Sequence, residues 1–341
     1  MGSDRQALRH SLLNCMGGAE SDFDGIALGI FDYQLAHNSP YRKYCTALGQ
    51  SQETVTRWQD IPPVPADAFK SCLPLTCFPP ENTIRTFLTS GTTSETKGEH
   101  HFCDLELYES AIIHGWRHAK LPELLQAYFA SRPPAETPNS SLGHMFQTLC
   151  PDHSPDRWLA TPGHGFDITS LIGQSTPLVL FGTSLSLLHL CHSTNPIALP
   201  AGSRVFQTGG FKGVSAEHNP EELSDQICRH FNIAEDQLIH EYGMTELSSQ
   251  SYAPGKNSNF RCPPWLRVQV IDPATGHSLP SGEPGYLVLY DLANLDSVLA
   301  VRTQDFARMI DHSTFQLLGR DPVALPRGCS RASDSFFQSA S

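Results

Sequence analysis

The stretch from Phe87 to Glu99 carries the side chains best suited to binding a polyphosphate. Hydroxyl groups, glycines and one lysine are packed closely there, at Ser90, Gly91, Thr92, Thr93, Lys97 and Gly98. Closely spaced backbone N–H groups, hydroxyl donors and a mobile cation are the groups that hold a polyphosphate. The stretch lacks the G-x-x-x-x-G-K-[ST] spacing of a P-loop. Taken alone, it fits an ordinary polar surface loop equally well.

Four later stretches combine turns or strand ends with hydroxyl, carboxylate or guanidinium side chains. They are Tyr242-Gly-Met-Thr-Glu246, Gly282-Glu-Pro-Gly-Tyr-Leu287, Arg302-Thr-Gln-Asp305 and Gly319-Arg320. Thr245 can donate a hydrogen bond to a phosphate, and Glu246 can hold Mg²⁺, which prefers a few oxygen ligands together with phosphate oxygens. Asp305 ends a predicted strand with a carboxylate that can bind vicinal hydroxyls, and Arg320 follows another strand. These residue types indicate a nucleotide site.

The elements expected to position these stretches alternate between helices and strands. Residues 1–60 are mainly helical by apolar spacing, with a break at Asn38-Ser-Pro40, where Asn38 or Ser39 is the predicted cap. Further helices are expected at 104–130, 166–174, 184–193 and 219–231. Strands or buried elements are expected at 85–89, 142–149, 177–181, 204–210 and in 238–247, where a tight turn follows. This alternation predicts an α/β fold with a mostly parallel sheet, followed by a small β-rich unit at 267–319.

Composition excludes several classes of function. The 341 residues carry a formal charge of −12, which argues against a nucleic-acid partner, since such proteins need a basic face. No run of roughly eighteen apolar residues occurs, so no membrane span is expected. No signal-peptide core begins the sequence, and cytoplasmic location is the default prediction. The ten cysteines form no C-x-x-C pair and are expected to be reduced thiols.

The stretches also resemble, in order, the motifs of the adenylate-forming superfamily, which includes acyl-CoA synthetases, luciferases and peptide-synthetase adenylation domains. Residues 89–98 resemble its T-S-G-T-T-G-x-x-K-G phosphate loop, and Tyr242 to Glu246 its Y-G-x-T-E motif. Gly282 to Leu287 is similar to its G-E-x-G-E-L motif, Thr303 to Asp305 to its T-G-D, and Gly319-Arg320 to its G-R hinge. The resemblance implies the superfamily's large-domain fold, with βαβ layers and a small β-barrel-like unit.

A narrower resemblance is to the acyl-protein synthetase family of bacterial bioluminescence. The stretches that carry it are Ile61-Pro-Pro-Val-Pro65, Phe69-Lys70, Ser140-Ser-Leu142, Thr208-Gly-Gly-Phe-Lys-Gly213 and Arg327-Gly-Cys-Ser330. In that family ATP activates a fatty acid as acyl-AMP, and the acyl group moves to a cysteine near the C-terminus and on to a reductase partner. The resemblance implies an adenylation domain at 1–301, and a hinge with a short C-terminal segment at 302–341. The full C-terminal lobe is then expected to be truncated.

The resemblance also implies roles for individual residues. The phosphate loop, from Ser90, Gly91, Thr92 and Thr93 to Lys97, would hold the β- and γ-phosphates of ATP. Thr245 would contact the α-phosphate, and Glu246 would hold Mg²⁺. Asp305 would bind the ribose hydroxyls, and Arg320 would lie near the ribose or phosphate. Gly209, Gly210 and Tyr242 would frame the adenine, and Gly243 would also belong to the nucleotide site. Lys212 would be a further contact to a phosphate or to the carboxylate.

Cys329 is the predicted acyl acceptor. It follows Gly328 and lies between Arg327 and Arg331, in a terminal segment that is polar and expected to be mobile. Nearby cations lower the pKa of a thiol and raise its thiolate fraction. A thiolate that attacks an acyl-adenylate gives a thioester and AMP.

The sequence departs from the superfamily pattern at several positions, and these leave alternatives open. Ser94 and Gln304 replace glycines, Tyr286 replaces a glutamate, and the late catalytic lysine of the C-terminal lobe is missing. This favours transfer to a cysteine over transfer to coenzyme A. One alternative is an enzyme that activates an aryl or short acid for a carrier protein or an amine. The other is a degenerate adenylation fold that serves as a non-catalytic binding partner.

Two histidine groups have the residue types of a metal site. They are His100-His101 with Asp104, and His189 with Cys191-His192. Neither comes with a further ligand group at a typical spacing, so surface or core histidines are the favoured interpretation.

Overall fold

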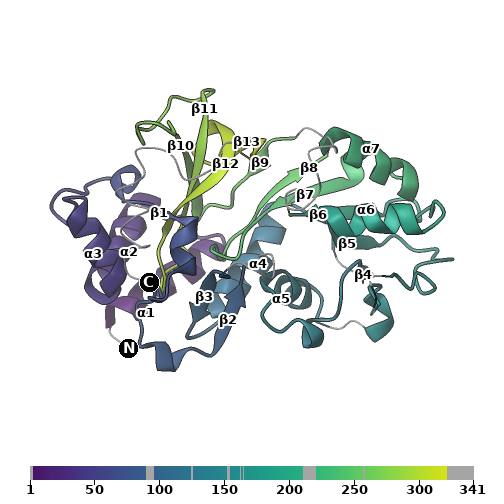
Figure 1. Cartoon of the computed structure of the whole chain (residues 1–341), viewed down its shortest axis with the longest axis horizontal. Helices are drawn as coiled ribbons and strands as arrows, with labels where there is room; N and C mark the ends of the chain where they lie inside the picture. The colour runs from purple at the N-terminus through teal and green to yellow at the C-terminus, as the bar shows by residue number, and fades with distance from the viewer. Residues whose placement is uncertain are drawn as a thin grey trace. The chain divides into compact units, whose positions relative to one another are not determined.

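The computed structural model describes residues 3–89, 96–123, 126–151, 154–161, 163, 165–209, 220–255 and 258–320. The chain divides into two compact units. Unit 1 comprises Met1–His118, Met244–Gln250 and Arg261–Ser341, and unit 2 comprises Ala119–Gly243 and Ser251–Phe260. Unit 2 holds most of the parallel strand pairs, whereas unit 1 holds the N-terminal helices and most of the antiparallel strands (Figure 1).

Unit 2 is built on a mostly parallel sheet, as predicted. Strands β4 (Ala127–Phe129), β5 (Val179–Thr183), β6 (Arg204–Thr208) and β7 (Leu238–Tyr242) are parallel neighbours in that order. Strand β8 (Ser251–Pro254) pairs antiparallel with β7. Most residues of β4 to β7 are buried, because short apolar runs form strands that are covered on both faces.

Alternate residues of these strands form two separate apolar layers. Leu180 and Val205 belong to a buried cluster with residues of α6 (Ser184–Ser193) and α7 (Pro220–Phe231). The register partners Phe129, Phe181 and Phe206 lie one residue further along and point to the opposite face. There Phe181 lies 5.1 Å, between ring centroids, from Phe146 of α5 (Ser141–Leu149). Unit 2 is therefore a three-layer α/β/α arrangement.

Unit 1 begins with three helices, α1 (Ser3–Met16), α2 (Phe23–His37) and α3 (Ser39–Ala47). Asn38 separates α2 from α3, and its side chain accepts a hydrogen bond of 3.1 Å from the backbone N–H of Tyr41. The predicted break and one of the two predicted caps are thus confirmed. A fourth helix, α4 (Glu106–His118), follows the hairpin of β2 (Arg85–Leu88) and β3 (Glu99–Phe102).

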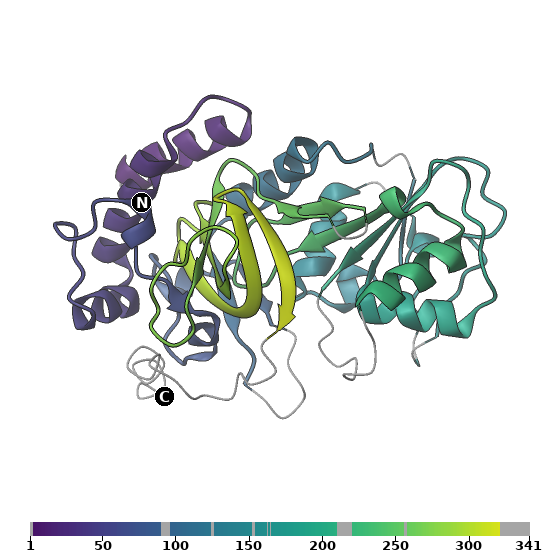
Figure 2. The ribbon, with the colours of Figure 1, turned by 90° about the horizontal axis from the view of Figure 1, so that it is seen from above.

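The β-rich part of unit 1 is a run of antiparallel strands. Its members are β10 (Leu266–Ile271), β11 (Pro284–Asp291), β12 (Ala300–Asp311) and β13 (Thr314–Arg320), and the short β1 (Val64–Pro65) pairs parallel with β12. The register shifts twice between β12 and β13, and such bulges bend strands. Figure 2 shows this curvature in the yellow strands. The two-residue strand β9 (Phe260–Arg261) contains the last residue of unit 2 and the next residue of unit 1.

Three of the predicted elements differ from the structure. Residues 142–149, expected as a strand or buried element, form helix α5, because Ser140 caps it by accepting the N–H of Gly143 at 3.0 Å. No helix forms at 166–174; the N–H of Thr169 donates to the side chain of Asp167, which closes a local turn instead. The helix predicted at 104–130 ends at His118, and β4 lies within the rest of that range.

Two further expectations concern larger segments. The predicted boundary between residues 301 and 302 falls inside β12, so a functional division at this point stays a prediction. Among the described residues, no helix is both long and apolar enough to cross a lipid bilayer.

Candidate active site

The hairpin β2–β3 holds the two ends of the predicted phosphate loop together. The N–H of Thr89 donates to the carbonyl of Gly98 at 2.9 Å, and the N–H of Gly98 donates to the Thr89 hydroxyl at 2.8 Å. Lys97 lies next to this closure and is exposed. Ser90, Gly91, Thr92 and Thr93 lie outside the described residues. The described part therefore fixes where the loop begins and ends.

The same hairpin contacts the segment that contains Thr245 and Glu246. His100 of β3 is buried, and its Nδ1 lies 2.8 Å from the carbonyl oxygen of Thr245. Because a carbonyl only accepts, His100 donates from Nδ1 as the neutral tautomer. Burial lowers the pKa of His100 to about 4, which keeps the ring neutral at physiological pH. His100 thus holds the backbone next to Glu246. The Glu246 residue is also buried.

Unit 2 presents other predicted nucleotide contacts at the carboxyl ends of β6 and β7. Gly209 follows β6 with a φ of +78°, in the left-handed region that favours glycine, and its carbonyl accepts the hydroxyl of Ser184 at 2.8 Å. Tyr242 ends β7 and packs edge-to-face on Phe260. In open α/β sheets, ligands bind outside the carboxyl ends of the strands. Gly243 follows Tyr242 directly, while Gly210 and Lys212 lie outside the described residues.

A buried acid lies just before these residues. Glu241 of β7 accepts a hydrogen bond from the hydroxyl of Thr208, its register partner on β6. Burial raises the pKa of Glu241 to about 7, although the Thr208 hydroxyl acts against that shift. Acids with raised pKa values are common at functional sites. The spacing of residues in the sequence did not single out Glu241.

Asp305 and Arg320 lie opposite each other on β12 and β13. The N–H of Asp305 donates to the hydroxyl of Thr303 at 3.1 Å, and Arg320 donates to the side-chain oxygen of Gln304 at 3.1 Å. Gln304 in turn donates to Asp67 at 3.1 Å. The departure from the T-G-D pattern at residue 304 therefore supplies a link between Asp67 and Arg320.

The Gly282–Leu287 stretch has a backbone role. Gly282 adopts a φ of +90°, and a Cβ placed on Gly285 would lie 2.3 Å from the carbonyl oxygen of Ile271. Backbone atoms cannot give way at that distance, so the β10–β11 pairing requires glycine at 285. The two glycines of this motif shape the sheet and need no role in chemistry.

The two histidine groups considered for metal binding have other partners or locations. His100 contacts Thr245 as described, and His101 lies 3.1 Å from Glu99 and 3.1 Å from the Thr86 hydroxyl. His189 and His192 are exposed on α6, whereas the intervening Cys191 is buried. These positions agree with surface and core histidines.

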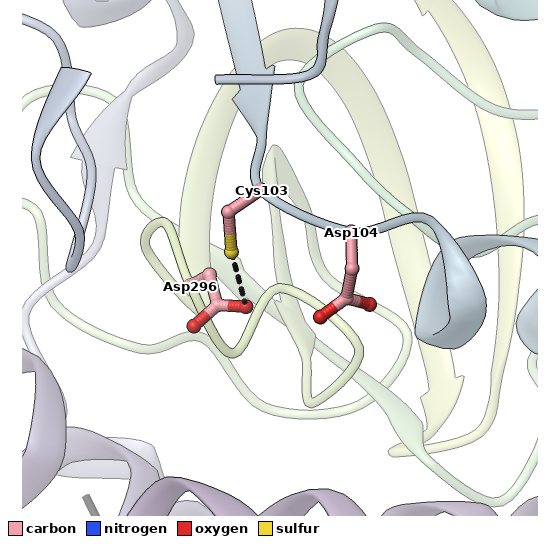
Figure 3. A group of neighbouring side chains, drawn as sticks. All are labelled: Cys103, Asp104 and Asp296. Atoms are coloured by element: carbon pink, nitrogen blue, oxygen red, sulfur yellow. Dashed lines mark hydrogen bonds between the residues drawn. The ribbon is translucent and has the colours of Figure 1, made fainter. Parts of the chain in front are cut away.

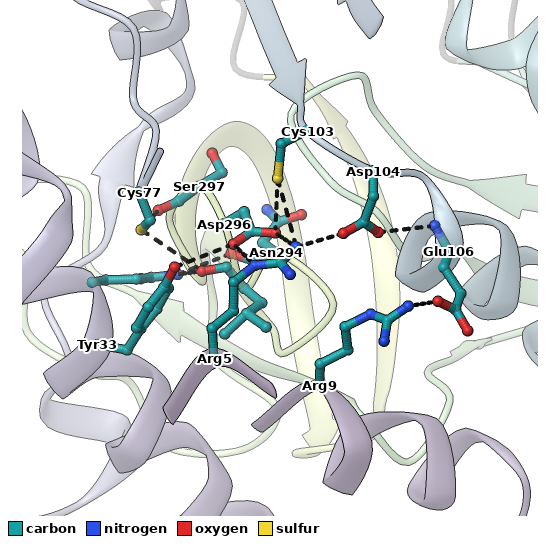
Figure 4. Close-up of polar contacts among 12 residues, drawn as sticks. Arg5, Arg9, Tyr33, Cys77, Cys103, Asp104, Glu106, Asn294, Asp296 and Ser297 are labelled. Atoms are coloured by element: carbon teal, nitrogen blue, oxygen red, sulfur yellow. Dashed lines mark hydrogen bonds and ion pairs between the residues drawn. The ribbon is translucent and has the colours of Figure 1, made fainter. Parts of the chain in front are cut away.

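The described residues contain one group with the spacing of metal ligands, and it is a different one. Ligand atoms of Cys103, Asp104 and Asp296 all lie within 4.8 Å of one another (Figure 3). A guanidinium already lies among them: Arg5 of α1 pairs with Asp104 and with Asp296, each at 2.5 Å (Figure 4). Its positive charge supplies what a metal ion would supply, so we interpret the group as an ion-pair cluster.

The predicted site residues thus fall into both units. Unit 1 holds Lys97, Thr245, Glu246, Asp305 and Arg320, and unit 2 holds Gly209, Tyr242 and Gly243. Cys329 lies outside the described residues. The sequence did not reveal that the His100 side chain donates to the backbone, or that Asp291 and Asn294 hold the segment after Thr245. Asp291 and Asn294 lie more than forty positions from that segment, and no local pattern marks them.

The fold is that of the large domain of adenylate-forming enzymes, since it matches solved structures that include those of a CoA ligase. 2-Hydroxyisobutyryl-CoA ligase in the postadenylation state with 2-HIB-AMP matches 87% of this chain and 67% of its own, with a TM-score of 0.62 and 16% identity. An open form with 2-HIB-AMP and CoA matches 87% and 69%, with a TM-score of 0.61 and 16% identity. ATP-bound MatB from Rhodopseudomonas palustris matches 71% of this chain, with a TM-score of 0.50 and 16% identity.

These matches cover only part of the longer enzymes. The chain spans 49% of MatB, about half of that protein's length. No protein-family model and no curated protein sequence matches the chain. The similarity therefore concerns the fold, and the predicted α/β fold class is confirmed.

Proposed function

We propose that this protein activates a carboxylic acid with ATP, forming acyl-AMP and pyrophosphate. The observation that supports the proposal is the adenylate-forming fold together with motif stretches at the ends of its strands. Tyr242 to Glu246 begins at the last residue of β7, and the predicted phosphate loop joins β2 to β3. One solved protein of this fold binds ATP and another binds an acyl-AMP.

In this proposal a carboxylate oxygen of the acid attacks the α-phosphorus of ATP, and pyrophosphate leaves. The reaction needs positioning and charge stabilisation more than covalent help. Lys97 and the loop hydroxyls bind the β- and γ-phosphates, and Thr245 donates to the α-phosphate. Tyr242 and Gly209 contact the adenine, and Asp305 binds the ribose hydroxyls.

Glu246 is the proposed ligand of Mg²⁺. Its carboxylate is a hard oxygen donor, as Mg²⁺ prefers, and the backbone that carries it is held by hydrogen bonds to the carbonyls of Thr245 and Glu246. When bound, Mg²⁺ would neutralise charge on the phosphates. Arg320 supplies a further cation near the ribose or phosphate in this scheme.

The finer part of the proposal concerns the acceptor. The thiolate of Cys329 attacks the acyl carbon of a fatty acyl-AMP, AMP leaves, and the acyl thioester passes to a partner such as an acyl reductase. Only the sequence resemblance to acyl-protein synthetases supports this step. Transfer of an aryl or short acid to a carrier protein or an amine remains the second candidate, because the fold serves it equally.

Purified protein incubated with ATP, Mg²⁺ and a panel of radiolabelled acids tests the proposal. We expect exchange of labelled pyrophosphate into ATP with at least one acid, and acyl label on the protein that is lost in Cys329→Ser. Exchange with no label on the wild-type protein would support the second candidate. ATP binding without exchange for any acid would contradict adenylation and support a non-catalytic binding partner.

A further inference from the structure

The segment after Glu246 is held by two buried side chains from the end of β11 and the loop that follows. Asp291 accepts the backbone N–H groups of Ser248 and Ser249, at 2.9 and 2.8 Å, and also the Ser249 hydroxyl at 2.7 Å. Asn294 donates to the carbonyl of Glu246 at 2.9 Å and accepts the Ser248 hydroxyl at 2.7 Å. We call Asp291 and Asn294 the inner brace.

Burying the carboxylate of Asp291 is energetically unfavourable. It is completely buried, and its hydrogen bonds come from neutral N–H and O–H groups, including the N–H of Ala293 at 3.0 Å. A buried carboxylate loses hydration that these donors only partly replace. Only a carboxylate, however, offers acceptor positions on both oxygens for donors from two sides. An aspartate at position 291 is therefore suited to fixing a single backbone conformation at residues 248–249.

The loop that carries the inner brace is itself anchored by the N-terminal helices. Arg5 of α1 donates to both oxygens of Asp296, at 2.7 and 2.5 Å, and also pairs with Asp104 (Figure 4). Gln34 of α2 donates to the carbonyl of Asn294 at 2.9 Å and accepts the N–H of Leu299 at 3.1 Å. We call Arg5 and Gln34 the outer anchor.

Two consecutive backbone carbonyls, on either side of the Glu246 Cα, are held from two different elements. The carbonyl of Glu246 accepts from Asn294, while the preceding carbonyl, of Thr245, accepts from His100 on the hairpin. Consecutive peptide groups are thus held from β3 on one side and from the 291–297 loop on the other. Two fixed carbonyls leave little freedom in the backbone dihedrals at Glu246, and with them in the direction of its Cα–Cβ bond.

We propose that Asn294 and Asp291 are positioning residues that aim the Glu246 carboxylate at the magnesium–phosphate group. This inference rests on the proposed function, since it assigns Glu246 to Mg²⁺. Partners outside the ligand shell orient the ligands, and their loss lowers metal affinity or activity by about 10- to 100-fold. The inner brace performs this task from a distance of more than forty residues in the sequence.

Asn294→Ala tests the assignment against Ser203→Ala, a matched control in unit 2. Ser203 is fully buried, and its hydroxyl accepts the backbone N–H of Leu178 at 3.1 Å. Both substitutions remove buried side-chain bonds to the backbone. The readouts are thermal unfolding, the rate of acid-dependent pyrophosphate exchange, and the Mg²⁺ concentration that gives half the maximal rate.

We expect Asn294→Ala to raise the half-saturating Mg²⁺ concentration and to lower the exchange rate, each by about tenfold. The KM for the acid should stay within about twofold of wild type, because the acid is not the group being aimed. Ser203→Ala should lower the unfolding temperature without changing the Mg²⁺ requirement. An Asn294→Ala protein that loses stability but keeps its Mg²⁺ requirement and rate would overturn the positioning role.

A second variant covers the case in which Asn294→Ala does not fold. Asn294→Asp keeps the shape and the acceptor for Ser248 but loses the donor to the Glu246 carbonyl, and the same rise in Mg²⁺ requirement is expected. If the wild-type protein shows no exchange with any acid, the proposed function fails on its own. The positioning role is then judged by the Mg²⁺ dependence of ATP binding, which Asn294→Asp should weaken; equal dependence in both proteins contradicts it.

Discussion

His100 shows how a single buried side chain links the hairpin to Thr245. Its ring contacts Phe69 and Phe102, with centroid distances of 5.4 and 4.2 Å, and its Nδ1 donates to the Thr245 carbonyl. Burial lowers the pKa of this histidine to about 4, so the ring makes these contacts in its uncharged form at neutral pH.

This histidine should give the protein a pH-dependent stability. Its pKa is about 4 when folded and 6.5 in the unfolded chain, so its contribution is complete above pH 6.5 and is lost as the pH falls towards 4. The shift corresponds to about 3 kcal/mol by pH 4. Urea unfolding of wild type and His100→Asn from pH 7 to 4 measures the difference. Asn keeps a donor near the position of Nδ1 but does not titrate.

The free energy of unfolding of wild type should fall more steeply with acid than that of His100→Asn. The difference between the two proteins isolates the histidine from Glu241 and Asp291, whose pKa values burial raises to about 7 and about 6. These two acids act in the opposite direction, because the stability that each contributes to the folded protein is lost as the pH rises through its folded pKa. Parallel curves for the two proteins would show that His100 does not titrate as the structure indicates.

At the scale of elements, the β2–β3 hairpin decides where the predicted phosphate loop starts. A Cβ on Gly98 would lie 2.9 Å from Cγ2 of Thr89 and 3.3 Å from its hydroxyl. Gly98→Ala should therefore push Thr89 aside and weaken the closing bond. We expect the KM for ATP to rise about tenfold, since a displaced loop loses contacts in ground state and transition state alike.

Thr89→Ser provides an internal control for this prediction. Serine keeps the hydroxyl that accepts from residue 98 and removes the methyl group that clashes. Steady-state kinetics of the double variant Gly98→Ala/Thr89→Ser should recover most of the affinity for ATP that Gly98→Ala loses. If the affinity for ATP does not recover, the effect of Gly98→Ala does not arise from the clash with the Thr89 methyl group.

The β10–β11 pairing makes a second element-scale prediction. Gly285→Ala should destabilise the protein by about 3 kcal/mol or more, because the methyl group meets the Ile271 carbonyl and cannot be accommodated by rotating a side chain. Gly143→Ala in α5 is the matched control, since its nearest neighbours lie at 3.4 Å or beyond. Denaturant midpoints measure both, and an equal, small effect at the two positions would contradict the close approach at Gly285.

The elements also show what the sequence could predict. Strands such as Arg204–Thr208 and Leu238–Tyr242 were predictable because each contains adjacent apolar residues and is followed directly by a glycine turn. The helix at Ser141–Leu149 was ambiguous because a nine-residue stretch with four large apolar residues fits either element. The turn near Asp167 was missed because one side-chain hydrogen bond outweighs a helical apolar pattern there.

At the scale of the whole molecule, motifs predicted the superfamily fold but not what supports the site. The chemistry-bearing residues Thr245 and Glu246 could be singled out because hydroxyl and carboxylate groups follow a turn. Their supports could not, because Asn294 and His100 reach them only through the tertiary fold. Arg5 and Asp296 are 291 positions apart and carry no sequence signal of their pairing.

The proposed chemistry makes one prediction about the fate of an oxygen atom. In adenylation, a carboxylate oxygen of the acid becomes bonded to the α-phosphorus and leaves with AMP when a nucleophile takes the acyl group. The most direct measurement supplies an accepted acid with ¹⁸O in its carboxylate, together with ATP, Mg²⁺ and hydroxylamine as the acyl acceptor. Mass spectrometry then reads the AMP.

We expect AMP that contains one ¹⁸O atom from the acid, and an acyl hydroxamate formed in equal amount. Glu246→Gln should lower the yield of both by roughly 100-fold, because the proposed carboxylate ligand of Mg²⁺ is lost and with it the cation that stabilises charge on the phosphates. AMP without ¹⁸O, or ADP and phosphate as the products, would contradict the proposal that this protein activates its acid as an acyl-adenylate.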